Sequence, residues 1–194
     1  MSQQATLPGF AAAAPTDRLF FALFPDDGVA ARLAALAATQ CARHGLHGRP
    51  QSAERMHVTL YHLGDSAGLR EDVVKAAQQA AAQVRAAPFV VAFDQVVTFA
   101  GHRQHKPFVL KSSGGNEALR AFHAQLGRAL HAAGLGRCAT AAFEPHVTLA
   151  YDACDVAAEP VAPIAWLAGE FVLVHSLLGK TRHIPLARWA LNAA

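Results

Sequence analysis

The tetrapeptide His-Val-Thr-Leu occurs twice in this chain of 194 residues, starting once at His57 and once at His146. Successive side chains of a β-strand point to opposite faces. In each copy the histidine therefore shares a face with the threonine, while the valine and leucine face the core. If two such strands lie side by side about a pseudo-twofold axis, His57, Thr59, His146 and Thr148 converge on one cleft.

Two imidazoles and two hydroxyls in one cleft suit phosphoryl chemistry. Imidazole titrates near ~6.5, so one ring can act as a base while the other holds a proton. On opposite sides of a phosphorus, one ring would activate water and the other would protonate the departing oxygen. The hydroxyls of Thr59 and Thr148 would donate to the non-bridging oxygens without a metal. A cyclic phosphodiester fits, because its ring oxygen needs a proton as it leaves. The near symmetry of the motifs leaves open which histidine is the acid.

A single such motif carries little information, because threonine is a common strand residue and a lone histidine is more often structural. Two copies at corresponding places in two similar halves favour chemistry. A decayed duplication without chemistry is the alternative interpretation.

The elements that position the motifs follow a repeated order. Hydrophobic periodicity predicts a strand, a helix, a motif strand and a hairpin in each half, and a long helix after the motif only in the first half. We therefore expect a duplicated α+β unit. The strand that contains Asp94 is expected to bend or bulge near that residue. The predicted strands are 18–24, 56–65, 89–100, 107–112, 143–152 and two more within 163–191, and the predicted helices are 26–45, 68–87 and 116–134.

The amino-acid composition limits the classes of protein to which the chain can belong. With 53% apolar and 16% charged residues the chain can bury a sizeable core, and its formal net charge of +3 leans only weakly toward a polyanionic partner. The three cysteines form no CxxC, which argues against a disulfide framework or a zinc knuckle and favours a reducing cytoplasm. No stretch is apolar for long enough to span a membrane. Residues 1–16 are expected to form a flexible tail, and 17–194 one domain.

Four segments in order carry a family resemblance: RLFFALFPDD, HVTLYHLGD, FEPHVTLAYD and GKTRHIPLARWAL. Over residues 18–191 the chain resembles the two-histidine phosphoesterase superfamily, and within it the bacterial RNA 2′,3′-cyclic phosphodiesterases, also called 2′-5′ RNA ligases. The resemblance implies a bilobal fold with two antiparallel sheets, outer helices and a central active-site groove. It also implies hydrolysis to a 2′-phosphate without metal or cofactor. His57 would be the proton donor to ribose O3′, His146 the proton acceptor that activates water, and Thr59 and Thr148 would hold the phosphate.

The chain departs from these relatives at two positions. His62 stands where many relatives have a phenylalanine that stacks on a nucleobase, and histidine can still stack. Tyr151 stands where relatives often have an arginine. If that arginine binds phosphate, its role passes elsewhere or is lost. The candidates to take it over are cations of the two predicted hairpin turns: Arg103, Lys106, Lys180 and Arg182.

The remaining histidines carry weaker signals. His102 and His105 could suggest a metal, but no carboxylate cluster accompanies them, so no metal site is predicted. The others are predicted to be surface or structural residues: His44, His47, His123, His131, His175 and His183.

Three functions compete at this stage. The first is hydrolysis of an RNA 2′,3′-cyclic phosphate end or a cyclic nucleotide. The second is reversible 2′-5′ ligation of tRNA halves, which could use the same two histidines. The third is a non-catalytic RNA-binding module. A monomer is expected, because the duplication already supplies a twofold arrangement.

Overall fold

A computed structural model describes residues 13–101, 104–138 and 142–192. The fold is α+β, with an eight-stranded sheet in the order β6-β3-β4-β5-β2-β1-β7-β8 and antiparallel pairing throughout. Most of the predicted tail lies outside the described residues. The strands are β1 Asp17–Leu23, β2 Val58–Ser66, β3 Phe89–Thr98, β4 Lys106–Lys111, β5 His146–Asp152, β6 Glu159–Ala168, β7 Glu170–Leu177 and β8 Arg182–Ala190. The α-helices are α1 Asp27–Arg43, α2 Glu71–Ala81 and α3 Glu117–Leu130.

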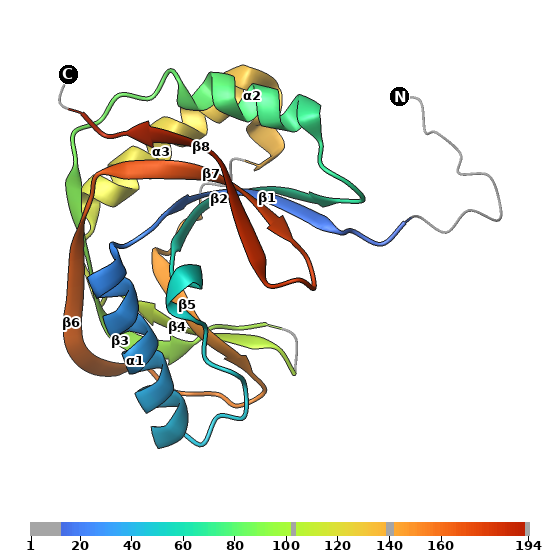
Figure 1. The fold of residues 1–194 in the computed structure, drawn as a ribbon. Helices are drawn as coiled ribbons and strands as arrows, with labels where there is room; N and C mark the ends of the chain where they lie inside the picture. The colour runs from blue at the N-terminus through green and yellow to red at the C-terminus, as the bar shows by residue number, and fades with distance from the viewer. Residues whose placement is uncertain (1–12, 102–103, 139–141, 193–194) are drawn as a thin grey trace.

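The two expected sheets are the two halves of this one sheet. Strands β2, β1, β7 and β8 form one half, and β5, β4, β3 and β6 form the other. The halves join where β2 meets β5, through the single residue pair Val58 and Val147. Figure 1 shows the two halves above and below this junction, with the β7–β8 and β3–β4 hairpins projecting toward the same side. Because one pair holds the strands together, they can splay apart on either side of it.

The spatial halves are not consecutive segments of the chain. The half that contains β5 takes β3 and β4 from before this motif strand in the chain and β6 from after it. The half that contains β1 and β2 is completed by β7 and β8, which come from the C-terminal end of the chain. The helices also cross over. Helix α1 follows β1 but contacts β5 and β6, whereas α3 follows β4, contacts β3 of its own half and also packs Phe122 against Phe171 of β7. Helix α1 therefore covers the other half, and α3 bridges the two.

The hydrophobic core continues through both halves as one cluster. Strand β1 divides its side chains by alternation: Phe21 and Leu23 face this core, while Phe20 faces a second, smaller cluster with Val172 and Val174 of β7. Phe24 packs against the smaller cluster. A second, smaller cluster of buried apolar side chains thus lies on the face of the sheet opposite the main core, next to the start of β2.

The predicted helices are confirmed with shorter ends. Asp26 caps α1 by accepting from the Val29 amide at 2.8 Å, as expected from the acids at its start. Helix α2 ends at Ala81, six residues before the prediction, because i→i−3 bonds tighten the chain there. After α3 the chain continues in a π-helical turn that ends around Gly134, whose φ of 82° favours glycine. In the described part of the chain, no helix combines the length and apolarity needed to cross a bilayer.

The strand prediction was wrong at one place and confirmed at another. The segment 163–191 contains parts of three strands, β6, β7 and β8, rather than two. The boundary was hidden because the single residue Gly169 separates β6 from β7. At this glycine the chain passes from one half of the sheet to the other. The expected irregularity near Asp94 is present as a register shift between Phe93 and Gln95.

Candidate active site

The junction of the halves sets the geometry of the two motifs. Val58 pairs with Val147 in antiparallel register, so His57 lies opposite Thr148, and Thr59 lies opposite His146. Both valines are fully buried, while the four flanking side chains are half-buried. The alternation inferred from the sequence therefore puts both His-Thr pairs on one face of the sheet, at the point where its halves meet.

Both histidines are held in the same way by their own chain. Nδ1 of His57 lies 2.7 Å from the Arg55 carbonyl oxygen, and Nδ1 of His146 lies 2.7 Å from the Glu144 carbonyl oxygen. A carbonyl only accepts, so Nδ1 carries the hydrogen in each ring. In the neutral form Nε2 then has a free lone pair, and in the imidazolium form it has a proton to give. Each ring is thus oriented for proton transfer through Nε2.

His57 lies in an aromatic enclosure. Its ring centroid is 5.1 Å from that of Phe20, 5.6 Å from that of Phe24 and 5.4 Å from that of His183. Burial among these rings lowers the pKa of His57 to about 4, although the Arg55 carbonyl opposes the shift. The nearby His183, Arg55 side chain and His146 lower the pKa further by charge repulsion.

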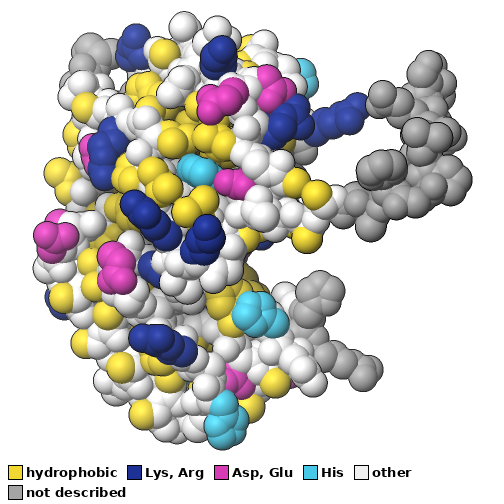
Figure 2. Space-filling view, turned by 45° about the vertical axis from the view of Figure 1, so that its right-hand side comes forward, with side chains coloured by type: hydrophobic (Ala, Val, Ile, Leu, Met, Phe, Trp, Pro, Cys, Tyr) yellow, Lys and Arg dark blue, Asp and Glu magenta, His cyan; other side chains and the backbone are white. Residues whose placement is uncertain are grey.

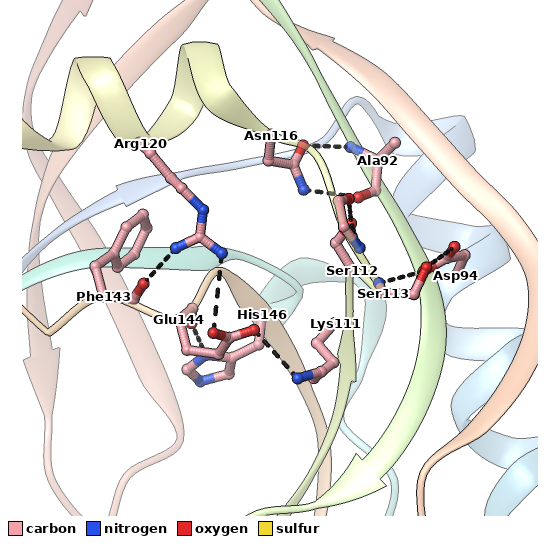
Figure 3. A network of polar contacts seen from close by, with 11 residues as sticks. Ala92, Asp94, Lys111, Ser112, Ser113, Asn116, Arg120, Phe143, Glu144 and His146 are labelled. Carbon is pink, nitrogen blue, oxygen red and sulfur yellow. Dashed lines mark hydrogen bonds and ion pairs between the residues drawn. The ribbon is translucent and has the colours of Figure 1, made fainter.

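His146 lies in a more polar setting, shown in Figure 3. Its one described aromatic neighbour is Phe99, at 5.1 Å between centroids. The carboxylate of Glu144 is held by Lys111 at 3.3 Å and Arg120 at 3.8 Å, and Arg120 also donates to the Phe143 carbonyl at 2.7 Å. Burial lowers the pKa of His146, while the carbonyl and carboxylate of Glu144 work against that shift.

A groove of about 690 Å³ runs along this face and takes residues from both halves. In Figure 2 the surface is hollowed at the right between the upper and lower parts of the molecule. The described lining includes three of the four predicted motif residues, His57, Thr59 and Thr148, but not His146. The other polar or charged side chains of the lining are Arg18, Gln51, Arg55, His62, His105, Tyr151, Ser176, Thr181 and His183.

His62 and Tyr151, the two predicted departures, both line the groove and occupy equivalent positions, each five residues after its motif histidine. His62 is exposed and its Nε2 lies 2.8 Å from the Asp65 carboxylate. Tyr151 stacks on His105 with centroids 4.3 Å apart and planes 2° from parallel. Tyr61 is instead buried, so the two motif tyrosines lie in different environments.

The four predicted hairpin cations do not come to the groove as a set. Lys106 pairs with Asp155 at 2.6 Å. Among the described lining residues none is Lys106, Lys180 or Arg182, although neighbours of the last two, Gly179 and Thr181, are present. Arg103 lies outside the described residues. The described lining therefore gives no support for Lys106, Lys180 or Arg182 as groove cations, and their role in phosphate binding stays a prediction.

Sequence reasoning missed two arginines and misjudged one histidine. His183 was predicted to be surface or structural, but its ring lines the groove against His57 and Phe20. Arg18 lies two residues before Phe20 on the same face of β1, and Arg55 two residues before His57. The spacing of two was a usable signal for Arg18, which lies in β1, but not for Arg55, which lies in a 3-10 turn where strand alternation does not apply. His123, by contrast, is structural, with its ring stacked on Tyr61 and its Nε2 near the Leu60 carbonyl.

Across the described part of the chain, no group of three or more His, Cys, Asp or Glu side chains is arranged to hold a metal ion. His105 is engaged with Tyr151, and His102 lies outside the described residues.

An α+β fold whose two sheet halves place a pair of HxTx motifs side by side on one face of the sheet defines the class of two-histidine phosphoesterases. A family model described as the 2′-5′ RNA ligase superfamily matches residues 19–180, and the chain belongs to this family. The chain is 29% identical over 158 residues to the RNA 2′,3′-cyclic phosphodiesterase of Escherichia coli (strain K12), covering 75% of this chain and 81% of the relative.

Two solved structures support the same grouping. The crystal structure of E. coli LigT complexed with ATP aligns with a TM-score of 0.71 and 25% identity, covering 92% of this chain and 99% of that one. A structure described as a phosphoesterase aligns with a TM-score of 0.72, 25% identity and the same coverage. The α+β architecture is thus shared over nearly the full length of these proteins.

Proposed function

We propose that this protein hydrolyses the 2′,3′-cyclic phosphate end of RNA to a 2′-phosphate, without a metal ion. The observation that carries the proposal is the matched orientation of His57 and His146. His57 directly precedes β2 and His146 begins β5, the two strands that meet at the junction, and both keep Nε2 available for proton transfer. Membership of the 2′-5′ RNA ligase superfamily and the identity to a cyclic phosphodiesterase support the same substrate class.

In this proposal the two histidines work in sequence on one phosphorus. Nε2 of His146 takes a proton from a water molecule as its oxygen attacks, and the P–O3′ bond breaks in line with that attack. Nε2 of His57 gives its proton to O3′, so that a free 3′-hydroxyl and a 2′-phosphate result. Thr59 and Thr148 donate to the non-bridging oxygens, where charge builds up. The assignment of His57 as donor and His146 as acceptor follows the pattern of the family.

The substrate itself helps to set the protonation states. In the free protein burial lowers the pKa of both rings, which favours two neutral histidines. A bound phosphodiester brings a negative charge next to them, and a nearby opposite charge favours the imidazolium form. We therefore expect the proton on His57 to be held mainly in the complex. Because the two rings interact, the pH profile of the enzyme would report the pair rather than either residue alone.

The direct test is incubation with an oligoribonucleotide that ends in a 2′,3′-cyclic phosphate, in the presence of EDTA. We expect a product with a 2′-phosphate at the same rate with and without the chelator. Absence of product, or a product formed only without EDTA, would contradict the proposal. A non-catalytic RNA-binding module would bind the oligonucleotide and leave its end unchanged.

Reversible 2′-5′ ligation is a second candidate, because the matching family model is described by that activity. Replacing water by the 5′-hydroxyl of a second RNA uses the same proton transfers. Adding tRNA halves with 5′-hydroxyl ends to the assay separates the two reactions. Joined RNA that a 3′-5′-specific nuclease cannot cut would indicate ligation.

A further inference from the structure

Two basic side chains in the groove have nitrogen atoms that are buried and unbonded. Nε of Arg55 and both ring nitrogens of His183 are shielded from solvent, and none has a hydrogen-bond partner among the described residues. Both side chains line the groove that contains the motifs. Buried polar groups are normally hydrogen-bonded, so unbonded ones concentrated at a groove mark a place where a ligand can bond.

The two side chains flank His57 from different elements. Arg55 belongs to the short 3-10 turn Ala53–Arg55 before β2, and His183 belongs to β8. The His183 ring meets the His57 ring nearly edge-on, with an interplanar angle of 89°. Charge on Arg55 lowers the pKa of both His57 and His183, which follows from its closeness to each. The three groups therefore surround the same end of the groove.

The other arginine of the groove is already engaged. Arg18 makes two bonds to the Asp65 carboxylate, each 2.7 Å long, and His62 shares that carboxylate. Arg55, in contrast, forms no ion pair with any described residue. Among the described arginines that line the groove, Arg55 is the one that makes no ion pair, although its charge reaches the exposed carboxylate of Glu54 and lowers the pKa of that group.

We propose that Arg55 and His183 form a phosphate-binding pair beside His57. This inference rests on the proposed function, because it assigns the cation that meets the phosphate in the same groove. A guanidinium fork matches the oxygens of a phosphate, and its bonds to them are charge-assisted. His183 adds a neutral donor from one ring nitrogen.

The test measures binding of inorganic phosphate, adenosine 2′-monophosphate and adenosine by isothermal titration calorimetry. Arg55→Gln removes the charge and keeps the backbone carbonyl that holds His57. We expect it to weaken binding of both phosphate ligands about 10–100-fold and to leave adenosine unchanged. His183→Phe keeps a ring against Phe20 and should weaken the phosphate ligands about 2–10-fold. Arg128→Gln, which removes an exposed charge on α3, is the matched control and should leave all three unchanged.

The outcomes separate this inference from the proposed activity. Loss of phosphate affinity in Arg55→Gln, in a protein that does not cleave cyclic phosphate, supports the pair and contradicts the activity. Cleavage by a protein whose Arg55→Gln variant binds both phosphate ligands like the wild type contradicts the pair alone. A wild-type protein that binds neither phosphate ligand also contradicts the pair.

Discussion

The two copies of His-Val-Thr-Leu are identical in sequence but lie in different surroundings. His57 is enclosed by Phe20, Phe24 and His183, with the charge of Arg55 nearby. His146 touches one described ring, Phe99, and lies next to a carboxylate, Glu144. The neighbouring arginine therefore acts to lower the pKa of the first motif histidine, and the neighbouring carboxylate acts to raise that of the second. A duplicated motif fixes the residue types and their orientation, while the elements around each copy set its electrostatics.

This difference bears on the division of labour between the histidines. A neighbouring carboxylate favours the imidazolium form of His146, and neighbouring cations disfavour it for His57. In the free protein His146 is thus the easier ring to protonate, whereas the family pattern makes His57 the proton donor. A bound phosphate close to Arg55 offsets the cations at His57. The acid and base roles would then be set when the substrate binds.

The largest expected effect comes from removing either ring. His57→Ala and His146→Ala should each lower kcat/KM for a 2′,3′-cyclic phosphate by about 10²–10⁴-fold, because each removes one of the two proton transfers. The double variant should lose little more than the worse single variant, since the rings act as a unit. His131→Ala, on the exposed end of α3, is the control and should stay within about twofold. Full activity in either single variant would contradict the two-histidine mechanism.

The threonines should show a smaller and more equal effect. Thr59→Val and Thr148→Val keep the shape of the side chain and remove its hydroxyl. Each should lower kcat/KM about 10–100-fold, as expected for a lost hydrogen bond to a charged group. Steady-state kinetics of the pair would show whether the halves contribute alike. A loss confined to one threonine would mean that the phosphate binds to one half of the groove.

Stability should depend on pH through His57 more than through His146. The pKa of His57 is about 4 in the folded protein and near 6.5 when unfolded, so the unfolded chain takes up the proton first as the pH falls. The contribution of neutral His57 to the free energy of unfolding is complete above about pH 6.5 and is lost as the pH falls toward 4. When the pH falls from 7.5 to 5, the free energy of unfolding measured with denaturant should decrease on the order of 1–2 kcal/mol less in His57→Gln than in the wild type. His146→Gln should reduce this loss of stability by a smaller amount. An equal reduction in the two variants would contradict the difference between the two histidines.

The smallest expected effects are changes in the pKa values of the two imidazoles, measured by NMR titration. Glu144→Gln should lower the pKa of His146, because it removes the neighbouring negative charge. Arg55→Gln should raise the pKa of His57, because it removes a neighbouring positive charge. Each substitution should act mainly on its own histidine. Shifts of the same sign in both variants would show that the charges do not distinguish the two motifs.

Local patterns predicted the elements well because they depend on neighbours in the chain. Alternation placed His57 with Thr59 and His146 with Thr148, and the helices differ from the structure mainly at their ends. The extra strand in 163–191 was missed because only Gly169 separates β6 from β7. The described lining gives no support for Lys106, Lys180 or Arg182, since the direction of a side chain in a hairpin turn depends on packing that no local pattern encodes.

The sequence by itself determined the two motifs, their strand character and the face that each polar pair shares, because these follow from residue type and the two-residue period of a strand. Tertiary structure alone decided that Val58 pairs with Val147 and that α1 and α3 cross between the halves. It also decided that His183 reaches the ring of His57 from 126 positions further along the chain. Contacts between such distant residues depend on how the strands assemble, so the different surroundings of two identical tetrapeptides could emerge only in the folded protein.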